Sequence, residues 1–189
     1  MNLTSGLHAT AVIYGESGVL ILGRSGSGKR ALALALLALA RSAGRFGALI
    51  GDDRVWIREA GGRLIASGAR SLAGVIERRM AGLLTVDCES AAVVRLVVEL
   101  SEPGRSWPRL PDDPDFLTLM GFEAPRLALR CGQSASEQAI AVDERLSLRS
   151  ENSDSRKRIS LEHCAAVHKN GKVAVPPRLD QRRKRESVD

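Results

Sequence analysis

The segment Gly23–Arg30 holds the residues of this sequence whose types and spacing point most directly to chemistry. Its glycines allow a tight turn in which successive backbone N–H groups face a phosphate, and Lys29 can reach the outer phosphates of a nucleotide. The segment departs from the pattern G-x-x-x-x-G-K-[ST] at its last position, where Arg30 replaces the hydroxyl residue that binds Mg²⁺. The residues predicted to bind phosphate are Gly23, Arg24, Ser25, Gly26, Ser27, Gly28, Lys29 and Arg30.

The residues on either side of this segment favour a phosphate loop. Val19–Leu22 is a short apolar run typical of a buried strand, and Ala31–Arg41 is rich in the helix formers Ala and Leu. Strand, glycine-rich turn and helix is the order in which such a loop works, because the helix N-terminus adds partial positive charge. Lys29 is also the only lysine among the first 150 residues. The alternative is a Gly/Ser turn with no ligand.

A pair of acids, Asp52 and Asp53, follows the short apolar strand predicted at Ala48–Gly51. Ligands bind at the carboxyl ends of strands in open α/β sheets, so this position suits a nucleotide site. One acid would lie near a metal ion and the other would take a proton from an incoming hydroxyl group. The alternative is an acidic turn that caps the next element.

Two further side chains are candidates with weaker support. His8 precedes the hairpin that leads into the loop, so it could serve as a base partner or donate to phosphate, although a lone histidine is more often packed or exposed. Glu77 is followed by Arg78 and Arg79, which could hold phosphate, but such a cluster is often only a solvated face.

The elements that must position these residues form an α/β domain with a mixed sheet and flanking helices, because hairpin turns interrupt the βαβ alternation. We expect the further strands Leu7–Ile13, Val55–Ile57, Arg63–Ala66, Leu83–Val86 and Ala91–Leu100. Gly74–Met80 is expected to be a loop or a short helix. Pro103–Pro114 carries four prolines and should be irregular, and Phe116–Phe122 and Pro125–Arg130 should be the last ordered pieces.

Composition divides the chain into an ordered domain over residues 1–149 and a basic, disordered tail over residues 150–189. The core must be aliphatic, because 44% of residues are hydrophobic and only 3% are aromatic. The tail carries most of the net charge of +6. Its run Arg182–Arg185 lacks interleaved aromatic residues, so a solubilising or membrane-surface tail is favoured over nucleic-acid binding. Three scattered cysteines and no long apolar run indicate a cytoplasmic protein with no membrane span.

Four sequence blocks of this chain together resemble the HPr kinase/phosphorylase family, in the short form that keeps only the catalytic domain. The specific blocks are His8–Gly15 with Gly18–Lys29, and Leu49–Val55; Ile76–Leu84 and Phe122–Leu129 match more loosely. The resemblance implies a P-loop fold related to phosphoenolpyruvate carboxykinase, and hexamers among full-length members, so a homo-oligomer is an expectation.

The resemblance also implies roles for individual residues. The loop would bind ATP, Asp53 would take the proton from a serine hydroxyl of an HPr-type phosphocarrier, and His8 would support Asp53. Glu77 would help bind Mg²⁺, with Asp52 as the second acid near the metal. The expected function is therefore an ATP-dependent serine kinase that also works as a phosphorylase. The alternative is a catalytically impaired, nucleotide-binding regulatory module, which the arginine at the loop's last position favours.

Overall fold

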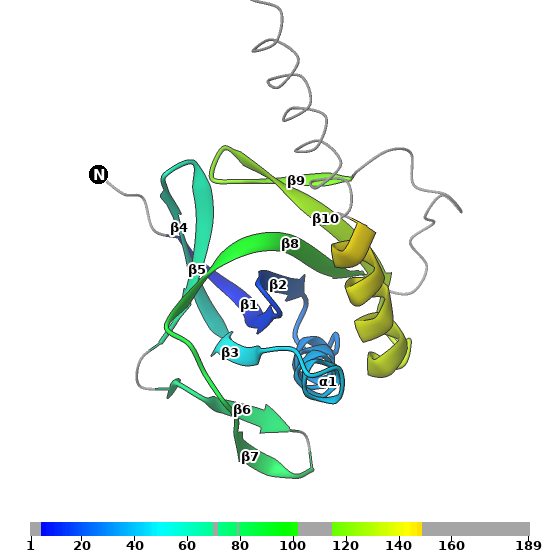
Figure 1. Ribbon diagram of the computed structural model, residues 1–189. Coiled ribbons are helices and arrows are strands. Elements are labelled where there is room, and N and C mark those ends of the chain that lie inside the picture. The colour runs from blue at the N-terminus through cyan, green and yellow to red at the C-terminus, as the bar shows by residue number, and fades with distance from the viewer. Residues whose placement is uncertain (1–4, 70–71, 79, 102–114, 149–189) are drawn as a thin grey trace, which may run out of the picture. The chain divides into compact units, whose positions relative to one another are not determined.

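The computed structural model describes residues 5–69, 72–78, 80–101 and 115–148, which lie within the first compact unit of the chain, Met1–Leu148 (Figure 1). The strands are β1 (Ser5–Tyr14), β2 (Ser17–Gly23), β3 (Gly47–Gly51), β4 (Arg54–Ala60), β5 (Arg63–Gly68), β6 (Val75–Arg78), β7 (Gly82–Thr85), β8 (Ala91–Ser101), β9 (Phe116–Leu119) and β10 (Phe122–Arg130). The helices are α1 (Lys29–Ser42) and a second helix over residues 135–148.

Strands β1 and β8 belong to two halves of one curved sheet. The first half of β1 pairs with β4, and its second half pairs with β3, while β2 lies along its other edge. In the same way, β8 begins against β5 and continues in parallel with β2. Because β2 pairs with both β1 and β8, the path through β4 and β5 closes on itself. The sheet is mixed, as predicted, since β2, β8 and β10 run parallel and their other neighbours are antiparallel.

The strand directions bring several chain segments to one edge of the sheet. Both β2 and β3 run antiparallel to β1, so their C-terminal ends lie beside the beginning of β1. Strand β8 is parallel to β2 and therefore ends at the same edge. His8 near the start of β1, the loop after β2 and the acids after β3 are consequently gathered there, although they are far apart in the sequence.

Alternation along the strands separates two aliphatic cores, as the scarcity of aromatic residues predicted. Val12 on β1 and Ile21 on β2 face the helices, whereas Ala11 and Leu20 face the space between the two halves of the sheet. Helix α1 buries the stripe Leu32, Leu36 and Ala40, spaced one turn apart.

The prediction of a loop or short helix over Gly74–Met80 was wrong. Residues Val75–Arg78 form β6, which pairs in antiparallel register with β7 in a separate two-stranded sheet. The polar pair Glu77 and Arg78 obscured the pattern, but Ile76 is fully buried against the helix-facing core. Tertiary burial of one isoleucine therefore decides the conformation of this segment.

The prediction that Pro125–Arg130 would be the last ordered piece was also wrong, because a helix follows over residues 135–148. The Ser134 hydroxyl accepts a hydrogen bond from the N–H of Glu137 over 3.2 Å, which caps the helix start. Ala139 and Val142 of this helix are buried in the same core as the stripe of α1. Two helices therefore cover one face of the sheet (Figure 1).

Three expectations fall on residues outside the described part of the chain: the proline-rich segment Pro103–Pro114, the tail beyond residue 149 and Arg79. Among the residues that the structure describes, no helix combines the length and apolar character needed to cross a membrane.

Candidate functional site

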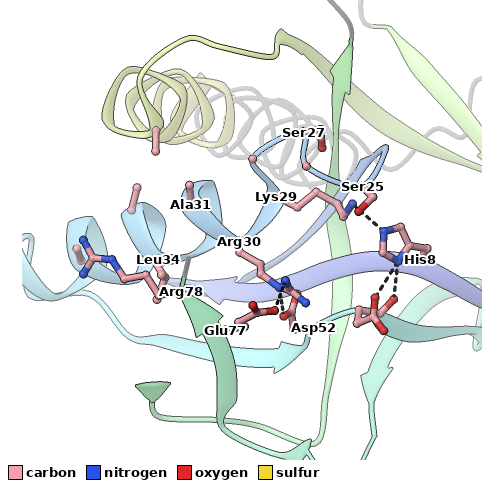
Figure 2. Close-up of a pocket in the computed structure, with 16 residues that line it drawn as sticks. His8, Ser25, Ser27, Lys29, Arg30, Ala31, Leu34, Asp52, Glu77 and Arg78 are labelled. Carbon is pink, nitrogen blue, oxygen red and sulfur yellow. Dashed lines mark hydrogen bonds and ion pairs between the residues drawn. The ribbon is translucent and has the colours of Figure 1, made fainter. Parts of the chain in front are cut away.

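A pocket of about 760 Å³ opens at the shared edge of the sheet, where the strand ends meet the start of α1 (Figure 2). It is lined by His8, Ser25, Gly26, Ser27, Gly28, Lys29, Arg30, Ala31, Leu34, Ala35, Ala38, Asp52, Asp53, Glu77, Arg78 and Ala135. All the predicted site residues line it except Gly23 and Arg24, whose carbonyl oxygens accept hydrogen bonds from Lys29. The pocket therefore joins segments that the sequence separates by many tens of residues.

The loop between β2 and α1 has the backbone conformation that its glycines were expected to permit. Gly26 and Gly28 have φ values of 79° and 101°, a region that other residues rarely adopt. Gly28 precedes α1 without a side-chain cap, and the first turn of the helix contains no acidic residue. The Ser27 hydroxyl oxygen is buried and, among the described residues, has no hydrogen-bond partner. An uncapped helix N-terminus and an unpaired buried hydroxyl fit a phosphate-bearing ligand.

Lys29 lies almost buried beneath the loop, with only 7% of its surface exposed. Its ammonium donates hydrogen bonds to the carbonyl oxygens of Gly23 over 2.7 Å and Arg24 over 3.0 Å, and contacts Nε2 of His8 at 3.1 Å. Burial lowers the Lys29 pKa from its ordinary value, and the nearby charge of Asp52 opposes that shift. The backbone of the loop therefore fixes the position of the Lys29 ammonium.

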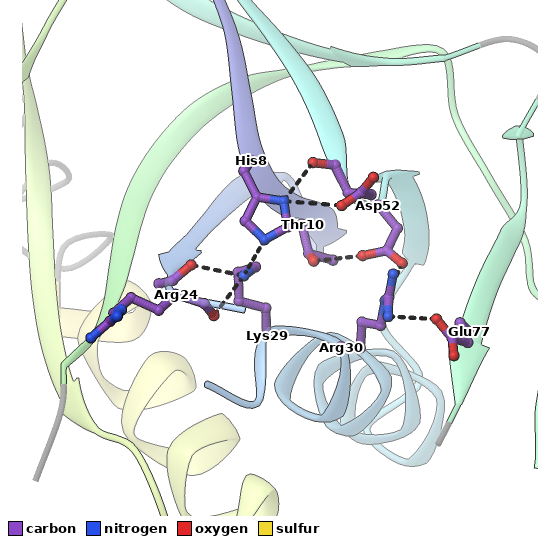
Figure 3. Close-up of polar contacts among 9 residues, drawn as sticks. His8, Thr10, Arg24, Lys29, Arg30, Asp52 and Glu77 are labelled. Atoms are coloured by element: carbon purple, nitrogen blue, oxygen red, sulfur yellow. Dashed lines mark hydrogen bonds and ion pairs between the residues drawn. The ribbon is translucent and has the colours of Figure 1, made fainter. Parts of the chain in front are cut away.

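His8 connects this lysine to Asp53, and Figure 3 shows how its ring lies beside Lys29. Nδ1 of His8 lies 3.0 Å from Oδ1 of Asp53 and 3.2 Å from its backbone oxygen. Asp53 has a left-handed backbone, with φ of 67°, which turns the chain sharply after Asp52. The side chains of His8 and Asp53 are 53% and 65% exposed, so the pair lies at the mouth of the pocket.

Asp52 points the other way and is only 9% exposed. Its Oδ1 accepts a hydrogen bond from the Thr10 hydroxyl at 2.8 Å, and its Oδ2 accepts one from Nε of Arg30 at 2.5 Å. The two neighbouring acids are therefore in different environments: Asp52 is held by two donors, whereas Asp53 faces the opening. Thr10 had no signal in the sequence beyond its place on β1, two residues after His8.

Arg30 also reaches Glu77, whose Oε2 lies 2.7 Å from Nη1 of the guanidinium (Figure 3). The hydrogen bond to Asp52 is the main cause of the raised Arg30 pKa. Asp52 and Glu77, the two acids predicted to lie near Mg²⁺, thus share one arginine. Among the described residues, no group of three or more acids, histidines or cysteines could hold a metal ion. The donor set as it stands does not fit a divalent cation between these two carboxylates.

One side of the pocket is apolar. Ala31, Leu34, Ala35 and Ala38 of α1 form a stripe along it, and Ala135 of the second helix also lines the pocket. The sequence analysis did not predict helix 135–148, so it missed the contribution of this helix to the apolar side of the pocket. The capping pattern Ser134-x-x-Glu137 was the signal that could have identified the start of the helix.

Two arginines of the described residues, Arg78 and Arg126, differ in their relation to the pocket. Arg78 lines the pocket beside Leu34 (Figure 2). Arg126 instead pairs with Asp115 at 2.8 Å and Glu99 at 3.1 Å, outside the pocket lining. Arg78 is therefore the described arginine, besides Arg30, that is placed to face a ligand there.

Comparisons with known proteins identify relatives of this chain. HPr kinase/phosphorylases from two strains of Clostridium botulinum, Eklund 17B (Type B) and Alaska E43 (Type E3), are each 30% identical to this chain over 157 residues. Each match covers 76% of this chain and 50% of the relative, so the chain spans about half the length of the curated relatives it matches. No family model matches the chain.

A solved structure shows the same fold. The HPr(Ser) kinase/phosphatase from Coxiella burnetii superposes with a TM-score of 0.64 at 22% sequence identity. The similarity covers 77% of this chain and 99% of that chain. The predicted α/β class with a mixed sheet and flanking helices is confirmed by this likeness and by the strand pairing above.

Proposed function

This chain belongs to the HPr kinase/phosphorylase family, and from that premise we propose that it transfers a phosphoryl group from ATP to a serine hydroxyl of an HPr-type phosphocarrier. The proposal also includes the reverse use of the site, in which the phosphoserine is dephosphorylated. Substrate, phosphate donor and direction are parts of the proposal.

The observation that carries the proposal is the connected series Lys29, His8 and Asp53. A phosphate-loop lysine and a carboxylate exposed at the pocket mouth are joined through one imidazole, with contacts of 3.1 Å and 3.0 Å. Phosphoryl transfer to a hydroxyl requires a cationic group at the phosphates and a base at the incoming oxygen. The proposal is supported because Lys29 and Asp53, the residues proposed for these two roles, line one pocket.

The roles follow from exposure and charge. Asp53 would take the proton of the serine hydroxyl, because its carboxylate is exposed where a protein substrate can reach it. His8 would hold that carboxylate in position. Lys29 and the backbone N–H groups at the start of α1 would stabilise the charge on the transferring phosphate. Bound ATP supplies the phosphoryl group. In the reverse, phosphorolytic direction, inorganic phosphate would accept the phosphoryl group to give pyrophosphate, and the protonated Asp53 would return its proton to the serine oxygen.

Transfer of radiolabelled phosphate from ATP to a purified HPr-type phosphocarrier tests this function. Asp53→Asn should lower kcat about 100-fold or more, because the base is lost. ATP binding should stay close to that of the wild type. Asp87→Asn is a matched control, since Asp87 is an exposed acid outside the pocket. Transfer that is equally fast in the Asp53 variant would contradict the assignment of the base.

A second candidate is a nucleotide-binding regulatory module that performs no transfer. The observation in its favour is the pair of contacts from Arg30 to Asp52 and Glu77, which engages the acids expected to serve a metal. The module is supported if the wild type binds ATP without transferring phosphate and Arg30→Ser gains transfer. Transfer by the wild-type protein above the Asp53→Asn background excludes it.

A further inference from the structure

The guanidinium of Arg30 lies between two carboxylates that come from different parts of the fold (Figure 3). Nε donates to Asp52 after β3, at 2.5 Å, and Nη1 donates to Glu77 on β6, at 2.7 Å. The two acids are 22 and 47 residues from Arg30 in the sequence. A single side chain on the first turn of α1 therefore holds both acids by ion-paired hydrogen bonds.

The same contacts oppose a divalent cation at this place. Mg²⁺ requires near-ideal octahedral geometry with oxygen ligands at about 2.0–2.1 Å. Both oxygens of Asp52 already accept hydrogen bonds, from Thr10 and from Arg30, and this carboxylate is nearly buried. A metal ion would have to displace a guanidinium that cannot lose its proton. A cation entering beside Arg30 would meet a fixed guanidinium, and two of the carboxylates around it already accept hydrogen bonds from that group.

Arg30 retains the capacity to bind a phosphate while it holds these acids. A guanidinium has five N–H donors, and the two contacts above account for two of them. The side chain is 41% exposed and lines the pocket, one residue after Lys29 at the N-terminus of α1. Arginine binds phosphate oxygens through paired, planar hydrogen bonds.

We propose that Arg30 acts as a built-in cation, which takes the place of the divalent metal ion so that the pocket binds nucleotide phosphates without Mg²⁺. This inference rests on the proposed nucleotide binding, and it holds whether or not the chain transfers phosphate. The positive charge between Asp52 and Glu77 is then the guanidinium of Arg30 and not a bound metal ion. The acids then serve to orient Arg30.

Calorimetric titration of ATP into the full chain, once with EDTA and once with MgCl₂, tests the proposal directly. The two dissociation constants should agree within about twofold. In Arg30→Ser, affinity in EDTA should fall at least about tenfold, because charged hydrogen bonds are lost, and MgCl₂ should restore it. Electron paramagnetic resonance should detect Mn²⁺ bound to Arg30→Ser with ATP absent, and none bound to the wild type.

Arg41→Ser is the matched control, because it removes an exposed arginine from the last turn of the same helix. It should bind ATP like the wild type in both conditions. The wild-type comparison does not depend on any variant folding, and circular dichroism checks the variants. Tight binding by the wild type only with MgCl₂ overturns the proposal and leaves nucleotide binding intact. Absence of ATP binding in both conditions overturns the proposed function, and the proposal with it.

Discussion

The Lys29 ammonium lies 3.1 Å from Nε2 of His8, and this contact determines which nitrogen of the imidazole carries the proton. An ammonium group can only donate, so Nε2 must accept. Nδ1 then carries the proton and donates it to Asp53 at 3.0 Å. The loop lysine therefore orients the histidine, and the histidine orients the acid.

Two substitutions of His8 distinguish the importance of its contact with Asp53 from that of its contact with Lys29. The amide nitrogen of asparagine can replace Nδ1 toward Asp53, whereas the amide of glutamine reaches the position of Nε2 toward Lys29. If His8 acts by positioning Asp53, His8→Asn should transfer phosphate about tenfold faster than His8→Gln, with similar KM for ATP. Steady-state kinetics with the phosphocarrier measure this. The opposite order would place the role of His8 at the lysine.

The lowered pKa of Lys29 predicts a pH-dependent stability. Burial lowers this pKa below 10.5, so between the lowered value and 10.5 the unfolded chain binds more protons than the folded chain. The contribution of Lys29 to the free energy of unfolding therefore increases as the pH rises through that interval. The stability of the wild type minus that of Lys29→Met should increase from neutral pH toward 10.5, as measured by urea unfolding.

The control for this measurement is Arg41→Met, because a guanidinium does not titrate in that range. Its stability difference from the wild type should stay flat. A flat difference for Lys29→Met as well would show that burial of the ammonium is not costly.

The hairpin of β6 and β7 predicts contrasting effects of two apolar substitutions. Ile76 is fully buried in the helix-facing core, so Ile76→Ala should lower the free energy of unfolding by about 2–5 kcal/mol. Leu83 on β7 is exposed, so Leu83→Ala should change it by less than about 0.5 kcal/mol. Denaturant titration compares them, and equal effects would mean that β6 does not bury Ile76.

The helix over residues 135–148 permits the same comparison within one element. Val142 is fully buried beside α1, and Val142→Ala should cost about 2 kcal/mol through lost methyl groups and the cavity left behind. Ile140 is exposed, so Ile140→Ala should cost less than about 0.5 kcal/mol. Thermal unfolding with circular dichroism measures both, and a larger loss at Ile140 would contradict the packing described here.

Helix 135–148 and strand β6 show where reasoning from the sequence failed, and why. Charged residues interrupt both segments, with Glu77 and Arg78 in β6 and Asp143–Arg145 in the helix, and they obscured the apolar pattern. Their conformation depends on a few residues, such as Ile76 and Val142, that become buried only when distant strands and helices have assembled. Burial of that kind is not a property of the local sequence.

The sequence by itself determined the local features: the glycine-rich loop between a strand and a helix, the paired acids after a strand, and the arginine after Lys29. These depend on the types and order of neighbouring residues, which set backbone conformation and the chemical groups available. Only the tertiary structure decided that Arg30 engages Asp52 and Glu77, and that His8 links Lys29 to Asp53. Such contacts join residues 21 to 47 positions apart, so they depend on the pairing and direction of strands that no local pattern specifies.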